Sequence, residues 1–334
     1  MLKAPKFWFS NGKYSLLISK IMTPLAMIWE VCARLRLMTG RYESFAVPIV
    51  CIGNITIGGS GKTPTSIALA ELCIQHGINA HIISKGYKGK CKGPKKVTSK
   101  DSAYEIGDEP LLMSNFAPVW VAKKRTHAIT SAINDGAELL ILDDGFQDSS
   151  IRKNISIITV DAQQAFGNKK VLPAGPLREK LHRGFKRADI LLVIGSEYQR
   201  EKFLNSNKLP KNLLIMSGEI TIVETGLNIE NTEFIAAAGI AHPRKFFDIL
   251  RLNGAKLIKE ISLPDHVVFS RTLIERLKKL ATKNNVSLIV TEKDYVKIPA
   301  CEKSNFVCLP IKLNFLQSKE LITLIKNTFD QSVK

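Results

Sequence analysis

The stretch CIGNITIGGSGKTPTSIALAELC, residues 51–73, runs from an apolar segment through a glycine-dense turn into a helical pattern. It approaches the pattern G-x-x-x-x-G-K-[S/T], in which backbone N–H groups and a lysine surround a triphosphate. Thr56 stands where the first glycine of that pattern is usual. The remaining glycines still let the backbone turn around an anion, and the following helix adds the positive end of its dipole. The stretch therefore predicts a nucleotide site rather than a merely flexible glycine turn.

The polar residues of this loop each suit one part of a nucleoside triphosphate. Lys62 reaches the β- and γ-phosphates, which makes it a predicted catalytic residue, and the Thr63 hydroxyl is placed to join a magnesium ion. Pro64 stands in the first helical turn, where its missing N–H costs little. The predicted nucleotide-binding residues are Thr56, Ile57, Gly58, Gly59, Ser60, Gly61, Lys62 and Thr63.

A second stretch, ELLILDDGFQD at residues 138–148, supplies the expected partner of the loop. Four apolar residues end in Asp143 and Asp144. A carboxylate at the C-terminal end of a buried parallel strand is where P-loop enzymes carry a magnesium ligand. Two adjacent acids would also repel each other without a cation. We therefore expect Asp143 and Asp144 to hold Mg²⁺ together with Thr63, beside a bound nucleoside triphosphate.

From residue 46 onward the sequence alternates between strand-like apolar runs and helical patterns. VPIVCIGN (47–54) and ADILLVIG (188–195) are typical of buried strands. Such alternation predicts an α/β fold, with a P-loop NTPase-like parallel sheet covered by helices over residues 46–212. Residues 213–232 indicate a short extended linker hairpin, and residues 233–334 a second, smaller α/β domain.

Residues 1–45 form a basic segment with the pattern of an amphipathic helix. Charged residues interrupt its apolar runs, which fall short of the ~20 residues that a spanning helix needs. Thr23 and Pro24 mark a helix start. A single apolar stripe follows, consisting of Leu25, Ile28, Trp29, Cys32 and Leu35. Such a stripe suits either a membrane interface or packing on the protein's own core.

The chain of 334 residues carries a formal net charge of +18 and six cysteines. The charge suits an anionic partner, whether nucleic acid, an anionic membrane surface or a phosphorylated substrate. The cysteines form no C-x-x-C pair and no zinc-finger spacing with histidine. They indicate a reducing compartment, with neither a disulfide framework nor a zinc site.

Several short motifs follow one another in a fixed order along the chain. They are GNITIGGSGKT (53–63), SKGY (84–87), GDEP (107–110), LDDGFQ (142–147), LPAGPLRE (172–179), GIAHPRKFF (239–247), PDH (264–266) and TEKD (291–294). In these motifs the chain resembles the tetraacyldisaccharide 4'-kinase family, the lipid A 4'-kinases, over about residues 45–300. The phosphate loop is generic, whereas LDDGFQ together with LPAGPLRE is specific to that family.

The resemblance implies transfer of the γ-phosphate of ATP to the 4'-hydroxyl of an acylated glucosamine disaccharide 1-phosphate, with Mg²⁺ as cofactor. It implies a peripheral or monotopic enzyme at the cytoplasmic face of the bacterial inner membrane, in contact with the lipid substrate and an anionic membrane surface. It also implies two α/β domains that close over the nucleotide, and no nucleic-acid partner.

The resemblance also suggests which side chains perform the transfer. Asp108 is the expected general base for the sugar hydroxyl, although an aspartate before Glu-Pro equally suits a helix cap. Glu109 is then available as a metal ligand. His266, from the second domain, is expected to face Asp108 and orient its carboxylate as the domains close.

Three further residues are expected to contact the substrate. Lys85 and Tyr87 begin a lysine-rich loop, whose later lysines are typical of a solvated segment. Lys85 replaces the arginine usual in this family, so it offers a point charge without bidentate geometry. Arg178 is expected to bind the substrate 1-phosphate or the transition-state charge; its alternative is a surface salt bridge with a neighbour such as Glu179.

Two other classes of P-loop protein compete with the kinase interpretation. A GTPase or metallochaperone-type NTPase is disfavoured because TEKD (291–294) has its lysine one place too late for the guanine pattern, and no Cys/His ligand cluster is evident. A nucleic-acid-stimulated ATPase would explain the charge. However, aromatic residues are not interleaved with the basic loop as base stacking requires, Tyr87 aside.

Overall fold

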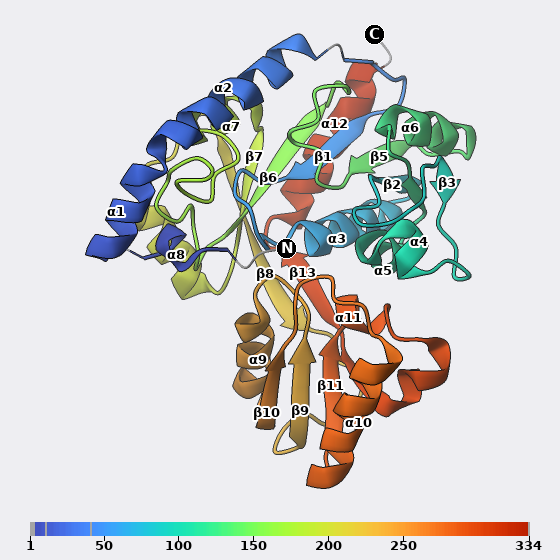
Figure 1. The fold of residues 1–334 in the computed structure, drawn as a ribbon. Helices are drawn as coiled ribbons and strands as arrows, with labels where there is room; N and C mark the ends of the chain where they lie inside the picture. Colours follow the sequence, from blue (N-terminus) through green and yellow to red (C-terminus); the bar gives the residue numbers. More distant parts are fainter. Residues whose placement is uncertain (1–3, 11, 41, 333–334) are drawn as a thin grey trace.

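The computed structural model describes residues 4–10, 12–40 and 42–332, which form a larger and a smaller α/β domain (Figure 1). In this described part of the chain, the larger domain is built on a nine-stranded sheet and the smaller on a four-stranded sheet. Two strands of the large sheet, β8 (Leu214–Ile222) and β13 (Ile311–Phe315), lead to the small domain.

The large sheet is parallel except at its two edges. Across the sheet its strands are β13, β8, β7 (Ile190–Ile194), β6 (Ile155–Asp161), β1 (Ile49–Gly53), β5 (Leu139–Leu142), β2 (Ala80–Ser84), β4 (Val119–Val121) and β3 (Lys95–Lys96). Only β3 and β13 pair antiparallel to their neighbours. Every residue of β1, β5 and β7 is buried, because helices cover both faces, and this explains their unbroken apolar sequences. The predicted P-loop-like parallel sheet is confirmed.

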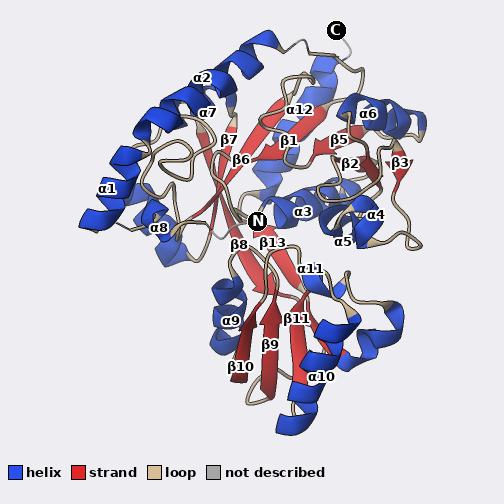
Figure 2. Cartoon of the chain, in the orientation of Figure 1, coloured by secondary structure: helices blue, strands red, loops and turns tan. Residues whose placement is uncertain are grey.

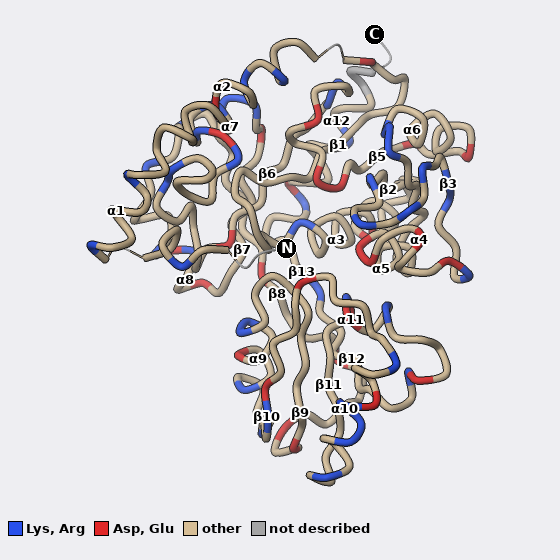
Figure 3. Tube along the Cα trace, viewed as in Figure 1, with Lys and Arg blue, Asp and Glu red and all other residues tan. Residues whose placement is uncertain are grey.

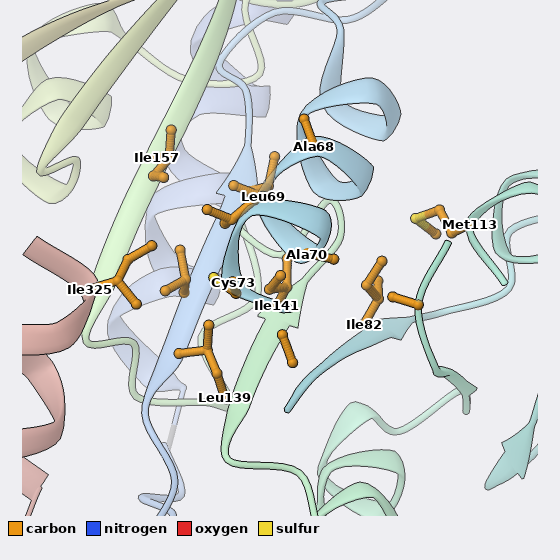
Figure 4. Close-up of a cluster of buried hydrophobic side chains, with 14 of the residues drawn as sticks. Ala68, Leu69, Ala70, Cys73, Ile82, Met113, Leu139, Ile141, Ile157 and Ile325 are labelled. Atoms are coloured by element: carbon orange, nitrogen blue, oxygen red, sulfur yellow. The ribbon is translucent and has the colours of Figure 1, made fainter. Parts of the chain in front are cut away.

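Two apolar cores lie on opposite faces of this sheet. The helices of the domain are α3 (Lys62–Gln75), α4 (Ala103–Ile106), α5 (Asp108–Met113), α6 (Arg125–Asn134), α7 (Leu181–Arg187), α8 (Glu197–Ser206) and α12 (Ser318–Ser332). On one face, Leu69 of α3, Leu139 of β5 and Ile325 of α12 belong to one cluster (Figure 4). On the other face, Leu140 of β5 and Phe203 of α8 belong to a second cluster. Successive side chains of β5 therefore belong to the cores on opposite faces of the sheet, beneath the helices that cover each face.

The small domain repeats the parallel arrangement at smaller scale (Figure 2). Its strands, in spatial order, are β10 (Lys256–Ser262), β9 (Glu233–Ala238), β11 (Ser287–Thr291) and β12 (Phe306–Leu309). Its helices are α9 (Pro243–Leu252), α10 (Arg271–Asn284), α11 (Glu292–Tyr295) and the 3₁₀ helix η2 (Ala300–Asn305). The C-terminal ends of β9 and β11 face the large domain, so that the loops after them can contribute to a shared site.

Two predicted boundaries need correction. The segment 213–232, expected to be a linker hairpin, begins with the single strand β8, which pairs parallel with β7 inside the large sheet. The domain expected at 233–334 ends near β12, because β13 pairs with β8 and α12 packs on the first core. Pro310, which lacks an N–H group, separates β12 from β13. The small domain is therefore inserted between two strands of the large sheet.

The N-terminal helices lie along the outside of the large domain (Figure 1). They are η1 (Lys6–Trp8), α1 (Lys13–Ile21) and α2 (Thr23–Thr39); residues 1–3, 11 and 41 of the predicted segment lie outside the described residues. The whole predicted stripe is exposed: Leu25, Ile28, Trp29, Cys32 and Leu35. The alternative in which this stripe packs on the protein's own core is therefore wrong.

The helix α2 instead contacts the large domain through polar groups. Glu30 lies 2.9 Å from Lys180 and 3.2 Å from Arg183, and the Trp29 indole donates to the Arg178 carbonyl. Exposed apolar side chains also occur outside the stripe, for example Met27. Among the described helices, none alone is long and apolar enough to cross a membrane; α1 and α2, bent by 53°, meet that requirement only as a pair.

Candidate active site

The phosphate loop joins β1 to α3 with the backbone geometry that an anion site requires. Gly58 and Gly61 adopt φ values of +121° and +84°, which disfavour any residue with a side chain. Thr56 has no positive φ and forms an isolated bridge with Leu177. The backbone at position 56 therefore does not require a glycine. This explains why a threonine can stand there while the loop keeps its conformation.

Hydrogen bonds behind the loop fix its shape. The Asn54 amide donates to Ser60 Oγ at 2.8 Å, and Ser60 Oγ lies 2.9 Å from the Thr159 hydroxyl on the neighbouring strand β6. Ser60 is buried, so its side chain holds the loop while its backbone remains available to phosphate. This bonding prepares the turn before any ligand arrives.

His242 of the small domain covers the loop from the other side. A Cβ atom added at Gly58 would lie 3.3 Å from His242 Nε2, and one at Gly59 3.2 Å from its Cδ2. Burial lowers the pKa of His242, and its Nε2 has no hydrogen-bond partner among the described residues. This histidine was not among the residues predicted from the sequence. Its motif, GIAHP, was the available signal.

The two aspartates after β5 differ in their surroundings. Asp144 Oδ1 lies 3.8 Å from Lys62 Nζ and accepts a 3.1 Å bond from Arg178. Burial opposes its charge, but Lys62 and Arg178 lower the pKa of Asp144 to about 2. Asp143 is 3% exposed and, among the described residues, accepts a single side-chain bond, from Ser66 at 3.1 Å. Burial, then Glu109 and Asp144, raise the pKa of Asp143 to about 7.

This contrast shows where a cation fits. Asp143 has no ion-pair partner among the described residues and lies near the charge of Glu109, whereas Asp144 is already paired with Lys62 and Arg178. No group of three or more His, Cys, Asp or Glu side chains in the described residues makes a complete metal cage. Mg²⁺ commonly binds one or two carboxylates and completes its shell with phosphates and water. The residues present fit such a partial site next to Thr63.

Asp108 and His266 form the predicted pair across the two domains. His266 Nδ1 lies 2.8 Å and 2.9 Å from the two Asp108 oxygens, with 7% and 5% of the side chains exposed. Burial raises the pKa of Asp108, but the His266 bond and Lys293 outweigh it, so that this pKa is lowered overall. The Tyr87 ring packs on the His266 ring, with centroids 5.4 Å apart.

The alternative role of Asp108 as a helix cap is wrong. Gly107 is the N-cap residue of α5, no side chain caps this helix, and Asp108 is its first residue. The Asp108 carboxylate accepts a 3.0 Å bond from the adjacent Glu109 N–H and also binds His266. These two contacts hold the carboxylate in position.

Lys293 is a site residue that the sequence analysis missed. Its ammonium, on α11, lies 3.0 Å from Glu109, 3.6 Å from Asp265 and 3.9 Å from Asp108. The signal was present in TEKD, a motif considered only as a possible guanine reader and as a mark of the family. The contact depends on a fold that brings α11 against α5, which spacing alone does not indicate.

Lys85 and Arg125 share a second ionic group beside the aspartates. Asp148 lies 3.2 Å from Lys85 and 2.8 Å from Arg125. Arg125, 4% exposed, also donates to the backbone carbonyls of Asp143 and Asp144. Of these three residues, Lys85 was predicted from the sequence, whereas Arg125 and Asp148 were not. Lys85 keeps 41% of its side chain exposed and so remains accessible to a ligand.

Arg178 does not form the surface salt bridge with Glu179 that was its suggested alternative role. Its guanidinium bonds Asp144 and the Gln147 side chain, while Glu179 is paired with Arg187. The possible Arg178–Glu179 surface bridge is therefore wrong. Arg178 instead lies on the same aspartate as Lys62, at the phosphate end of the site.

Comparisons with known proteins agree with this geometry. The family model described as tetraacyldisaccharide-1-P 4'-kinase matches residues 18–330. The tetraacyldisaccharide 4'-kinase of Jannaschia sp. (strain CCS1) is 39% identical over 313 residues, which cover 93% of this chain and 94% of the relative. That of Dinoroseobacter shibae is 36% identical over 336 residues, which cover 100% and 99%.

A solved structure has the same fold over nearly its whole length. LpxK from Aquifex aeolicus, an "apo" form in complex with ATP, matches with a TM-score of 0.76 and 25% identity, over 93% of this chain and 99% of that chain. Sequence motifs, fold and site geometry thus lead to one assignment. The chain belongs to the tetraacyldisaccharide-1-P 4'-kinase family.

Proposed function

We propose that this chain transfers the γ-phosphate of ATP to the 4'-hydroxyl of an acylated glucosamine disaccharide 1-phosphate. Membership of the family supports the reaction, and the Aquifex aeolicus relative was solved with ATP. One observation carries the proposal. Helix α3, which begins at Lys62 of the phosphate loop, lies in contact with α5, whose first residue is Asp108, and Asp143 is bonded to α3 through Ser66. An acceptor-side carboxylate and a phosphate loop therefore share one site.

The large domain holds the phosphates. Backbone N–H groups of the loop and the N-terminus of α3 surround the β- and γ-phosphates, and Lys62 adds a positive charge. Asp143, Glu109 and Thr63 would hold Mg²⁺, with Asp144 kept in place by Lys62 and Arg178. When bound, the cation neutralises charge on the phosphates. Arg178, beside Lys62, is suited to the negative charge of the transferring group rather than to a distant 1-phosphate.

Asp108 acts as general base on the acceptor. The 4'-oxygen forms a bond to the γ-phosphorus as the bond to the bridging β–γ oxygen breaks, and the hydroxyl proton passes to the Asp108 carboxylate. The lowered pKa of Asp108 keeps this carboxylate ionised and ready to accept. His266 is a positioning residue, because its Nδ1 holds Asp108 and the Tyr87 ring holds the imidazole.

The substrate side of the site is lined by Lys85 and Tyr87. Both side chains are exposed, at 41% and 48%, although each is anchored by a neighbour of the site. Lys85 offers a point charge to a sugar or lipid phosphate, and Tyr87 offers a ring face and a hydroxyl. We propose that they contact the disaccharide next to Asp108.

The N-terminal helices are proposed to hold the enzyme on an anionic membrane surface. Exposed apolar side chains on α1 and α2 include Leu17, Ile21, Leu25 and Ile28. Basic residues of α2 and α7 lie beside each other at the same edge of the molecule (Figure 3). Such a combination binds a lipid interface through apolar burial and attraction to acidic headgroups. With ATP as co-substrate, the surface is the cytoplasmic face of the inner membrane.

Vesicle flotation tests the membrane proposal. The protein should float with vesicles of acidic phospholipid, and Leu25→Ser with Ile28→Ser should reduce the bound fraction several-fold. Leu252→Ser, at an exposed apolar residue of α9, is the matched control and should leave binding unchanged. Equal flotation of all three proteins would contradict a role for α2.

Transfer of label tests the reaction. The protein, with [γ-³²P]ATP, Mg²⁺ and the acylated disaccharide 1-phosphate, should yield a labelled lipid. GTP should replace ATP poorly, and a labelled lipid should not form from an acceptor that lacks the 4'-hydroxyl. Nucleotide hydrolysis without lipid product, stimulated by nucleic acid or specific to GTP, would replace the kinase proposal by one of its rivals.

A further inference from the structure

Lys293 lies among three carboxylates, and the proposed reaction gives this lysine no role. Its ammonium contacts Glu109, Asp265 and Asp108 at 3.0, 3.6 and 3.9 Å. Only 17% of the Lys293 side chain is exposed. Two of the three carboxylates belong to the large domain and Lys293 to the small one. A nearly buried cation in this position is specific to the assembled pair of domains.

The backbone around Lys293 is fixed by its neighbours. Lys293 lies in the first turn of α11, directly after β11. Thr291 caps this turn by accepting a bond from the Asp294 N–H, and the Asp294 carboxylate accepts a 2.8 Å bond from the Gly239 N–H at the end of β9. Two adjacent strands therefore determine where the Lys293 side chain begins. Because the backbone of Lys293 is fixed, its long side chain can hold the Glu109 carboxylate in a defined position.

The contact with Glu109 uses one of its two carboxylate oxygens. Lys293 donates to Oε1, and no hydrogen bond to Oε2 is found within the described residues. Glu109 is also close enough to Asp143 for the two charges to interact. The small domain thus holds one oxygen of the same carboxylate whose charge acts on Asp143.

We infer that Lys293 is a positioning residue that holds Oε1 of Glu109 and so directs Oε2 to the magnesium site beside Asp143. This inference rests on the proposed function, in which Glu109 is a metal ligand. Hydrogen-bonded partners orient the carboxylates that bind metals, and their loss typically weakens metal binding about 10–100-fold. Because Lys293 comes from the small domain, metal binding and domain approach favour each other.

Binding of Mn²⁺, followed by electron paramagnetic resonance, measures this role without turnover. With a non-hydrolysable ATP analogue present, Lys293→Met should weaken Mn²⁺ binding about 10–100-fold relative to wild type. Lys293→Arg, which keeps the charge, should recover part of the loss. Lys278→Met is the matched control, because Lys278 is a small-domain lysine with two carboxylate partners away from the site, and it should bind as wild type does.

A double-mutant cycle with Glu109→Gln separates positioning from general damage. If Lys293 acts through Glu109, Lys293→Met adds little to the loss that Glu109→Gln already causes. Affinity for the analogue without metal should remain within twofold of wild type. Unchanged or tighter Mn²⁺ binding in Lys293→Met, or a full additional loss in the Glu109→Gln background, would overturn the inference. Wild-type protein that binds no Mn²⁺ and makes no labelled lipid would instead remove the proposed function, and this inference with it.

Discussion

The phosphate side and the acceptor side of the active site are assembled differently. On the phosphate side, the loop after β1 and Asp144 after β5 come from adjacent strands of one sheet. On the acceptor side, Asp108 meets His266, which lies 158 positions later in the small domain. The phosphate loop and the aspartates belong to a single domain, although His242 of the small domain covers the loop, whereas the Asp108–His266 pair exists only while the two domains are in contact. The first should therefore bind nucleotide by itself, and the second should respond to anything that separates the domains.

The two sides also differ in how they treat charge. Asp108 interacts with His266 and Lys293, so its negative charge is compensated before a substrate binds. Asp143 has no such compensation, and its pKa rises to about 7. The charge on the acceptor side is therefore compensated by the protein itself, whereas the charge on the phosphate side requires a bound cation.

The largest expected effects come from removing one charge on each side. Asp108→Asn should lower kcat about 10²–10⁴-fold because no base accepts the hydroxyl proton. Lys62→Met should lower kcat about 10²–10³-fold because charge on the transferring phosphate is less stabilised. Initial rates of lipid phosphorylation measure both.

Nucleotide affinity distinguishes these two variants. Calorimetry should show near wild-type ATP binding for Asp108→Asn and weaker binding for Lys62→Met, since only Lys62 belongs to the phosphate loop. Equal loss of ATP affinity in both would contradict the division of the site into two sides.

A smaller effect concerns the dependence on pH. Because the pKa of Asp143 is raised to about 7, a proton competes with the metal below that pH. The Mg²⁺ concentration for half-maximal rate should rise about tenfold for each pH unit below 7. The lowered pKa of Asp108 predicts that the rate at saturating Mg²⁺ stays nearly constant over the same range. A falling maximal rate with a constant Mg²⁺ requirement would reverse the roles of the two carboxylates.

The smallest expected effect is on stability. Without metal at pH 8, Asp143→Asn removes an uncompensated buried charge and should raise Tm by about 2–4 °C, equivalent to about 1 kcal/mol. Asp144→Asn breaks contacts with Lys62 and Arg178 and should lower Tm by less, because 37% of the Asp144 side chain is exposed and solvent screens the pair. Differential scanning calorimetry measures both Tm shifts. Shifts of the same sign would contradict the difference in charge compensation between Asp143 and Asp144.

The sequence predicted the phosphate side because its determinants are local. A buried strand, a glycine turn and a lysine at a helix start lie within 23 residues, and the two aspartates end the next strand in the sheet. The parallel sheet followed from unbroken apolar runs such as β1 and β7. These features depend on periodicity and on backbone geometry, which neighbouring residues determine.

Tertiary features were harder to predict. The return of β13 to the large sheet depends on pairing with β8, almost 90 residues earlier, and both strands are partly exposed and weakly patterned. Asp108 and His266 were named from a family resemblance, not from spacing. Lys293, Arg125 and His242 were missed because each acquires its role only through contacts between distant segments.

The central claim is that one triphosphate lies between the phosphate loop and Asp108. A crystal structure with a non-hydrolysable ATP analogue and Mg²⁺ tests it most directly. The account predicts the γ-phosphate within hydrogen-bond distance of Lys62 Nζ, facing the Asp108 carboxylate with room for one hydroxyl group between them. A triphosphate bound outside the loop, or protein atoms filling the space between γ-phosphate and Asp108, would contradict it.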